Sequence, residues 1–318
     1  MPPFEYRRPN SLGEALALLD PDARAIAGGT ELVNWLQDGI EAPARLVDIR
    51  RLPLAGIRRD GDLLRIGAVA RLADIARDPT VAAEIPGLSQ AIGASASAQI
   101  RHMGTLAGNL LQQTRCPYFR LPDAGTAVPC HLRAAGTGCA ATGGVSRSAA
   151  LLGNQGPCIA THPSDPAVVL AALDASVTVV GPSGSRSVDL AVLYQGAARS
   201  FGIARSELIV ETVVPLGAVA RSSQFLKLRD RSSFDFALVS GSAAVTEAGV
   251  RLVLGGVSWG PWRCHVAERH LAPGSLTSDS VREAMTAEFA TAWPTEQNRF
   301  KLELATRLAT RLLVRSPA

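Results

Sequence analysis

The chain has 318 residues, of which 47% are hydrophobic and 19% charged. This composition excludes a disordered protein and, at roughly 150 residues per domain, is typical of two domains. The net charge is only +4 and aromatic residues make up 5%, with the basic residues scattered singly or in pairs, so no nucleic-acid-binding stripe is expected. The longest apolar run, 167–173, is too short to span a membrane.

The first 115 residues predict alternating helices and strands. Ser11 and Glu14 have the spacing of a capping box, which predicts a helix that begins there and stops at Asp20-Pro21. A strand at 24–27 runs through a glycine loop into a helix at 31–38. Further strands are predicted at 45–49 and 63–68, followed by a broken helical stretch at 72–94.

Periodicity disappears between residues 116 and 158, where glycines punctuate a segment with no sustained apolar pattern. Loops of this length are uncommon in compact domains unless something functional holds them, so we interpret about 112–160 as an insert. A helix is expected from Ser164 to about residue 174, and strands are expected at 177–180 and 208–214. The sequence Pro215-Leu216-Gly217 then indicates a domain boundary, giving domains 1–216 and 217–318.

The second domain is expected to contain strands followed by helices. Strand-like segments cover 224–228, 237–245 and 250–257, and the last two are joined by a turn. The final helix is expected to start near residue 295, where an apolar stripe begins.

Two glycine-containing loops are candidates for binding an anion. Gly28-Gly29-Thr30 lies between a predicted strand and helix, where backbone N–H groups attract a phosphate, although a tight turn explains it equally simply. A second loop, 104–109, is again small and rich in backbone donors. Neither matches the Rossmann or Walker pattern, so NAD-type and ATP-type sites of those kinds are disfavoured.

Four of the five cysteines lie in the insert. They are Cys116, Cys130, Cys139 and Cys158. No pair has the C-x-x-C spacing of most zinc ribbons, yet four thiolates also suit a [4Fe–4S] cluster, and two disulfides or unrelated cysteines remain open. Cys264 stands apart and is expected to be a buried small hydrophobe.

No hydrolytic motif is present, and no acid–base catalytic pair is expected. Asp165 stands at a helix start, where it suits an N-cap and a ligand contact about equally. Lys227 lies in a strand-like run and, from the residues alone, is more typical of a charge on an edge strand.

Taken together, residues 27–32 and 100–110 resemble the two loops of the FAD-binding medium subunits of molybdenum hydroxylases, the xanthine dehydrogenase family. The resemblance implies that the first loop wraps the FAD pyrophosphate and that the second, usually T-[IV]-G-G-N, also contacts the cofactor. Here Ala107 replaces the first glycine of that pattern. The residues implied to bind FAD are Ile26, Ala27, Gly28, Gly29, Thr30, Glu31, Leu32, Thr105, Gly108, Asn109, Asp165 and Lys227.

The insert is similar to that of the periplasmic-type aldehyde oxidoreductases of this family, whose four cysteines bind an additional [4Fe–4S] cluster. The resemblance therefore implies Cys116, Cys130, Cys139 and Cys158 as cluster ligands. It also implies an α+β fold, with an FAD-binding domain of two α+β subdomains (PCMH/VAO type). A smaller C-terminal domain of antiparallel sheet and helices follows.

The family further implies partner subunits. A large subunit holds the molybdenum cofactor, where an aldehyde or aromatic substrate is oxidised, and a small subunit carries two [2Fe–2S] clusters. This chain is then expected to pass electrons from those clusters through FAD to an external acceptor. The N-terminal segment lacks the apolar core of a signal peptide, so we expect a cytoplasmic protein or one exported with a signal-bearing partner.

Three alternatives remain at this point. A 4-hydroxybenzoyl-CoA reductase type subunit would run electrons in the opposite direction. A stand-alone flavin reductase, such as the UDP-N-acetylmuramate-forming enzymes, would act without partners. A zinc-stapled interaction module would be no enzyme at all.

Overall fold

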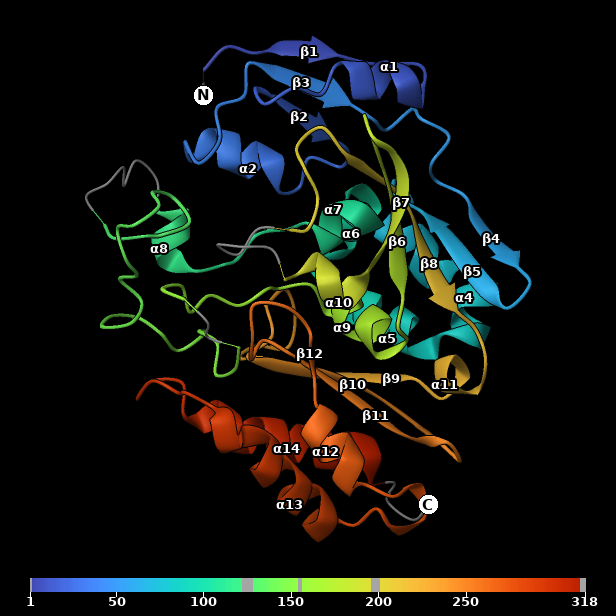
Figure 1. Cartoon of the computed structure of the whole chain (residues 1–318), viewed down its shortest axis with the longest axis vertical. Coiled ribbons are helices and arrows are strands. Elements are labelled where there is room, and N and C mark those ends of the chain that lie inside the picture. The colour runs from blue at the N-terminus through green and yellow to red at the C-terminus, as the bar shows by residue number, and fades with distance from the viewer. Residues whose placement is uncertain (1, 122–127, 154–155, 196–200, 315–318) are drawn as a thin grey trace.

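The computed structural model describes residues 2–121, 128–153, 156–195 and 201–314, and within them the strands form three sheets. The first sheet is parallel, in the order β1-β3-β2, whereas the other two are antiparallel, in the orders β4-β5-β8-β6-β7 and β12-β11-β10-β9. Figure 1 shows the first sheet at the top and the third toward the bottom. The mixed α+β class expected from the sequence is confirmed.

The small first sheet packs against one of the two helices that connect its strands. Its strands are β1 (Glu5–Arg7), β2 (Ala23–Ile26) and β3 (Arg45–Asp48), with α1 (Leu12–Ala17) and α2 (Leu32–Gln37) between them. Ala15 of α1 packs with Val47 of β3 in a buried apolar cluster. Only half of the expected capping box forms, because Ser11 accepts from the Glu14 N–H while the Glu14 carboxylate accepts from the N–H of Asn10 instead.

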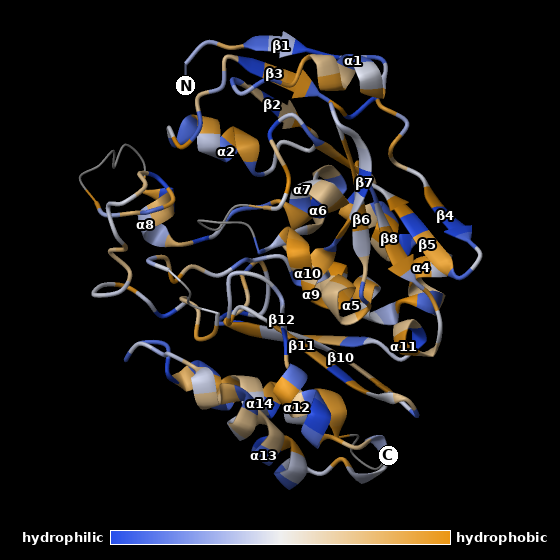
Figure 2. Ribbon diagram, in the orientation of Figure 1, coloured by the Kyte–Doolittle hydropathy of each residue, from blue (hydrophilic) through white to orange (hydrophobic). Residues whose placement is uncertain are grey.

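The second sheet and the helices around it form the largest core. The strands are β4 (Ile57–Asp60), β5 (Leu63–Gly67), β6 (Ser176–Gly181), β7 (Gly184–Asp189) and β8 (Leu208–Pro215). The helices are α3 (Leu72–Arg77), α4 (Pro79–Glu84), α5 (Pro86–Ala94), α6 (Ala98–Met103), α7 (Leu106–Leu110), α9 (Asp165–Ala172), α10 (Leu190–Leu193) and α11 (Ala218–Arg221). Figure 2 shows α9 as strongly hydrophobic, in keeping with its burial on almost every side.

The third sheet lies between two layers of helices. Its strands are β9 (Gln224–Leu228), β10 (Val239–Thr246), β11 (Gly249–Gly255) and β12 (Trp262–Arg263). Helices α5 and α9 form one layer against the sheet. The other layer consists of α12 (His265–His270) and α14 (Phe300–Leu313), which contact the sheet, and α13 (Ser278–Glu288), which packs against both of these helices. The two short 3-10 turns are η2 (Pro273–Ser275) and η3 (Phe289–Thr291). Cys264 is fully buried in this region, as expected.

The insert is the irregular part of the described chain, drawn in green at the left of Figure 1. Apart from the four-residue helix α8 (Pro117–Arg120), its described residues form turns and one isolated bridge between Cys130 and Cys139. The lack of periodicity in the sequence therefore correctly predicted that this segment has little regular secondary structure.

Four of the described strands were not predicted from the sequence, the two-residue β12 among them, and the start of the last helix was placed too early. Strands β4 and β7 form the two edges of the second sheet and expose mostly charged or small polar residues, so they lack the apolar alternation of buried strands. Strand β1 is only three residues long. Helix α14 begins at Phe300 because the preceding residues form a turn, in which the Asn298 side chain accepts from the N–H of Thr295.

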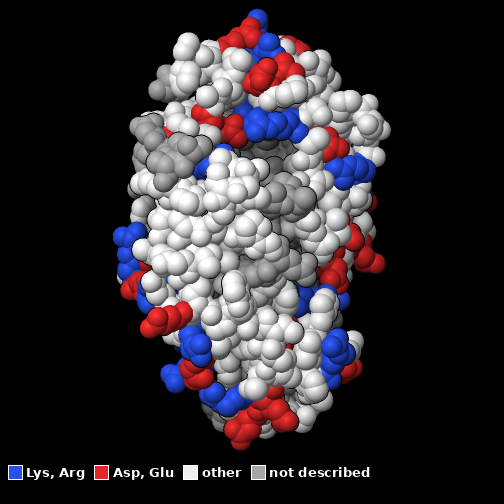
Figure 3. Space-filling model, turned by 60° about the vertical axis from the view of Figure 1, so that its left-hand side comes forward, with Lys and Arg blue, Asp and Glu red and all other residues white. Residues whose placement is uncertain are grey.

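No helix among the described residues is long and apolar enough to cross a membrane. Figure 3 brings the left-hand side of Figure 1 forward, and most Lys, Arg, Asp and Glu side chains lie toward the ends and edges of that face. Over the described residues of this face no continuous basic stripe is visible. This agrees with the scattered charge of the sequence.

Candidate functional site

A cavity of about 720 Å³ lies where the first sheet, the helices α6 and α7, and strand β9 meet. All twelve residues that the resemblance assigned to FAD line this one cavity. The volume is within the range of cavities that hold cofactors. The sequence placed these residues in four separate segments, and the fold brings them together.

The first glycine loop follows β2 and leads into α2. Gly29 has a φ of +71°, a conformation that residues with a Cβ rarely adopt. A Cβ on Gly28 would lie 2.0 Å from the Met103 carbonyl oxygen and 3.1 Å from the Cα of Gly104. A residue larger than glycine does not fit at position 28, because the second loop passes directly against it. The backbones of both loops therefore form the same wall of the cavity.

The second loop is held by side-chain capping. Thr105 is the N-cap of α7, and its hydroxyl accepts a 3.3 Å hydrogen bond from the N–H of Gly108. Asn109 lies one turn along, where its Oδ1 accepts from the Ser164 hydroxyl at 2.6 Å. Thr105 and Asn109 thus have structural partners, and the hydrogen bond of Asn109 joins this loop to the start of α9.

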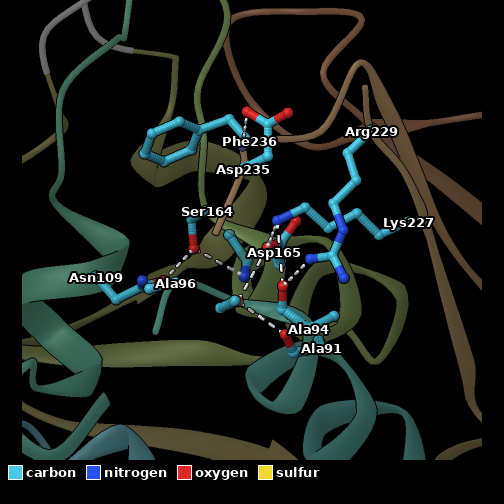
Figure 4. A network of polar contacts seen from close by, with 12 residues as sticks. Ala91, Ala94, Ala96, Asn109, Ser164, Asp165, Lys227, Arg229, Asp235 and Phe236 are labelled. Carbon is cyan, nitrogen blue, oxygen red and sulfur yellow. Dashed lines mark hydrogen bonds and ion pairs between the residues drawn. The ribbon is translucent and has the colours of Figure 1, made fainter. Parts of the chain in front are cut away.

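Asp165 and Lys227 form a buried ion pair at the cavity wall, shown in Figure 4. The Lys227 Nζ lies 2.7 Å from the Asp165 Oδ2, which also accepts from the Ser95 hydroxyl at 2.9 Å. Burial raises the pKa of Asp165, and Lys227 and Ser95 oppose that change. Arg229 completes the network by donating to the Ala94 carbonyl at 2.9 Å, beside the longer contact from Lys227.

Two sequence interpretations need correction here. The N-cap of α9 is Ser164, whose hydroxyl accepts from the N–H of Ala167, so Asp165 is free of that role. Lys227 does lie on an edge strand, but its side chain is only 4% exposed. Helix α5 covers this edge, and the lysine is a buried charge instead of a solvated one.

Glu31 lines the cavity, but its carboxylate is already engaged by the insert. It accepts from the Arg115 Nη1 at 2.6 Å, the Arg120 Nη2 at 2.5 Å and the Gln113 N–H at 3.1 Å. These hydrogen bonds connect the start of α2, directly after the first glycine loop, to the segment that contains Cys116. Nothing in the sequence pattern links these positions, because the partners of Glu31 lie more than eighty residues away.

Several further residues line the cavity and were missed by the sequence analysis. They include Ser95, Gln113, Arg115, Arg231 and Phe236. Basic and acidic side chains line the cavity in equal numbers, so the wall offers no excess of cationic side chains to an anion. Backbone N–H groups of the glycine loops then become the main candidates for binding a pyrophosphate.

The four insert cysteines come close to one another without forming a preformed metal site. Cys130 and Cys139 face each other across an antiparallel bridge, and Cys116 interacts electrostatically with both. Contact with the Cys158 thiol lowers the pKa of Cys139 to about 5, whereas burial raises the pKa of Cys116. Among the residues that the structure describes, no group of three or more His, Cys, Asp or Glu side chains has a metal-binding arrangement.

His162 lies between the insert and Asp165, but it belongs to the core. Burial lowers its pKa to about 3, and its ring packs against Tyr194 at a centroid distance of 4.6 Å. Phe201 and Trp259 complete this aromatic group. An imidazole that stays neutral in such surroundings is a packing residue.

Comparison with known proteins agrees with this geometry. Residues 2–217 match the family model described as the FAD binding domain in molybdopterin dehydrogenase. The chain is 41% identical over 327 residues to the aldehyde oxidoreductase FAD-binding subunit PaoB of Escherichia coli (strain K12), covering 100% of this chain and 99% of that protein. It is 26% identical over 324 residues to the carbon monoxide dehydrogenase medium chain of Hydrogenophaga pseudoflava, covering 99% and 96%.

A solved structure shows the same fold. A chain of carbon monoxide dehydrogenase from Hydrogenophaga pseudoflava, in a form that lacks the Mo-pyranopterin moiety, superimposes with a TM-score of 0.74 at 26% identity. The match covers 98% of this chain and 96% of that chain. The chain therefore belongs to the FAD-binding subunits of the molybdenum hydroxylases, a family of oxidoreductases.

Proposed function

We propose that this chain is the FAD-binding medium subunit of an aldehyde oxidoreductase, in which it passes electrons from the [2Fe–2S] clusters of a partner subunit through FAD to an external acceptor. The observation that carries the proposal is that all twelve expected FAD residues line one cavity of about 720 Å³. The name of the E. coli relative, 41% identical along the whole chain, supports the aldehyde as substrate class.

The residues of the cavity suit FAD. Gly28 and Gly29 let the backbone approach a pyrophosphate, and the Asp165–Lys227 pair presents one acceptor and one donor to the sugar or ribityl hydroxyls. The flavin itself supplies the redox chemistry, and the protein binds and orients it. Oxidation of the aldehyde takes place in the large molybdenum subunit, so this chain needs no acid–base pair.

We also propose that Cys116, Cys130, Cys139 and Cys158 bind one [4Fe–4S] cluster. The support is that a loop with little regular structure brings all four thiols near one another. Cys139 and Cys158 are hydrogen-bonded, and Cys116 interacts electrostatically with Cys130 and Cys139. Among the described residues, none of these four cysteines forms a disulfide bond. The thiols interact in pairs and are not arranged around one point, so the backbone of the insert must rearrange for them to bind a cluster.

Partners and domain division follow the same reasoning. We propose a division near residue 216, with an FAD-binding domain at 1–216 and a C-terminal domain at 217–318, which the extent of the family match at 2–217 supports. The "medium chain" designation of the Hydrogenophaga relative supports assembly with a large and a small subunit. A 4-hydroxybenzoyl-CoA reductase type subunit remains the second candidate, with electrons running toward the substrate.

The test is an anaerobic purification of the full chain with flavin and iron counted per polypeptide. About one FAD and four irons are expected, with visible absorbance that bleaches on dithionite. Replacing each of Cys116, Cys130, Cys139 and Cys158 by Ser should remove iron. Cys264→Ser is the matched control, because Cys264 is buried in a separate core and should leave the iron content unchanged.

Each outcome has a defined consequence. FAD without iron would support the flavoprotein assignment and overturn the proposed [4Fe–4S] cluster. Zinc in the same preparation would show that the cysteines of the insert bind zinc instead. Absence of FAD would overturn the proposal as a whole. Aldehyde-dependent reduction of an acceptor by the complex with its large and small subunits distinguishes the proposed direction from the reverse one.

A further inference from the structure

Glu31 occupies the junction between the two proposed cofactor sites. It follows the Gly28–Thr30 loop directly and stands at the start of α2. Its side chain is 16% exposed, and both carboxylate oxygens accept charge-assisted hydrogen bonds from Arg115 and Arg120. Hydrogen bonds of this kind are stronger and more directional than those between neutral groups. The carboxylate is therefore a fixed link rather than a free ligand.

The other end of the link is the beginning of the cysteine insert. Arg115 immediately precedes Cys116, and Arg120 ends the short helix that Cys116 caps. The Arg120 guanidinium also donates to the carbonyl oxygens of Thr114 and Gln113, at 2.9 and 3.2 Å. The position of the first proposed cluster ligand is thus defined by side chains that converge on Glu31.

Aromatic rings strengthen the same junction. Trp35 of α2 and Phe119 of α8 meet edge to face at a centroid distance of 6.4 Å. The Arg120 guanidinium lies over both rings, 5.7 Å and 5.6 Å from their centroids. Helices α2 and α8 are therefore held together by ring packing and cation–π contacts, not only by a single exposed ion pair.

Arg115 faces both proposed sites. It lines the large cavity and also a neighbouring cavity of about 50 Å³ that Cys116 lines. Its Nε and the Oε1 of Gln113 are buried and have no hydrogen-bond partner in the described structure. Buried polar atoms rarely stay unpaired, so this segment offers a donor and an acceptor to a ligand on its cavity side.

We propose that Glu31, with Arg115 and Arg120, couples the two sites, so that FAD binding and cluster assembly raise each other's affinity. The inference rests on the proposed function, because it requires both cofactors. Glu31 acts as a positioning residue: it holds the glycine loop and the first cluster ligand in one arrangement. Coupling of this kind is reciprocal, so either cofactor favours the other by the same factor.

The test compares FAD affinity in iron-loaded and iron-depleted full-length protein, measured by quenching of flavin fluorescence. For the unaltered chain we expect FAD to bind about tenfold more tightly to the iron-loaded form, within the usual range of coupling between sites. Glu31→Gln keeps the shape but removes the charge, and the ratio should fall to about one. A ratio of about one in the unaltered chain, or an unchanged ratio in Glu31→Gln, would overturn the coupling.

Glu84→Gln is the matched control. Glu84 is also shared by two arginines, Arg59 and Arg221, at 3.2 and 3.1 Å, and its side chain is 18% exposed. It lies on α4, outside the residues that line either cavity. This variant should keep the affinity ratio of the unaltered chain, and loss of the ratio here would show that any shared carboxylate has the same effect.

A second measurement does not depend on removing iron. Hydrogen exchange in peptides covering residues 112–121 should slow when FAD is added to the unaltered chain and should not respond in Glu31→Gln. Equal protection in both proteins would overturn the coupling. A chain that binds neither FAD nor iron would overturn the proposed function instead, so the two failures are distinguishable.

Discussion

In the cavity of about 720 Å³, helices and strands position the lining residues, whereas the cysteine insert is positioned by side chains from distant parts of the sequence. The cavity wall is formed where β2 leads into α2, where α6 leads into α7 and where β9 passes α5, so ordinary backbone geometry sets the positions of Gly28, Thr105 and Lys227. The insert has only one short helix among its described residues and needs anchors from elsewhere.

The insert is also anchored by the first turn of α14 and the residues just before it. The fully buried Lys301 donates to the carbonyl oxygens of Ala149 and Gly256, at 3.0 and 2.8 Å. Asn298, also fully buried, donates to the carbonyls of Ala149 and Ala150. The stretch between the third and fourth cysteines is therefore held in place by the C-terminal helix and the residues just before it.

One of the two lysines of the chain lies in each region: Lys227 lines the cavity, and Lys301 holds the insert. Lys227 is paired with a carboxylate, whereas Lys301 donates to two carbonyl oxygens and has no ion pair with a carboxylate in the described part of the chain. Removal of Lys227 leaves a buried carboxylate without its cation, whereas removal of Lys301 leaves two buried carbonyl groups without their donor. The following predictions use that difference.

The largest effect is expected from Lys227→Met. It leaves the Asp165 carboxylate buried without its cation, which costs about 3–5 kcal/mol of unfolding free energy. Urea unfolding followed by circular dichroism measures the change. The double variant Lys227→Met/Asp165→Asn should recover much of the loss because no unpaired charge remains. Arg282→Met, which breaks the exposed pair with Glu303, is the control and should change little.

Lys301→Met should be the next largest, at about 1–3 kcal/mol, because two buried carbonyl groups lose their donor. Burial lowers the pKa of Lys301 from 10.5 to about 7. The unfolded chain therefore binds more protons between these values, and the contribution of Lys301 to stability rises as pH increases through this range.

The pH dependence separates this interpretation from simple loss of packing. The difference in unfolding free energy between the unaltered chain and Lys301→Met should be larger at about pH 10 than at pH 7. Arg307→Met, on the exposed side of the same helix, should show no such trend. A difference that shrinks with rising pH would contradict the lowered pKa.

Gly28→Ala tests the cavity wall directly. The added Cβ would overlap the Met103 carbonyl and push the two glycine loops apart. Overpacking of this kind costs about 1–3 kcal/mol, so FAD affinity should fall by roughly 10- to 100-fold. Gly93→Ala on α5 is the matched control, since its Cβ would meet nothing within 4 Å. Unaltered FAD affinity in Gly28→Ala would show that the loops do not form the binding wall.

The contrast between the regions also explains what the sequence could predict. Glycine loops, strand patterns and helix starts are local signals, so each glycine loop could be located from the sequence, and the family resemblance then assigned both loops to one site. The burial of Lys227 was not predictable, because helix α5 covers an edge strand that looks solvated in sequence.

The insert offers the opposite case. Its irregularity and its four cysteines are evident in the sequence, but its anchors are not. Glu31 and Lys301 look like ordinary charged residues of helices, and only the tertiary structure brings them to Arg115 and to the Ala149 carbonyl. Contacts between residues so far apart leave no periodic or motif signal.

The smallest effect is expected from Thr105→Ala, and it decides between two roles for the second loop. The structure gives the Thr105 hydroxyl a capping role toward the Gly108 N–H, worth about 1 kcal/mol of unfolding free energy. Thr105→Ser retains the capping oxygen and should keep most of that stability. If capping is the whole role, FAD affinity in Thr105→Ala should change by less than about threefold, because α7 frays only at its start. If affinity instead falls by about tenfold or more while stability is unaffected, the hydroxyl contacts FAD directly, as the family resemblance implies, and the second loop binds FAD through this side chain as well as through its backbone.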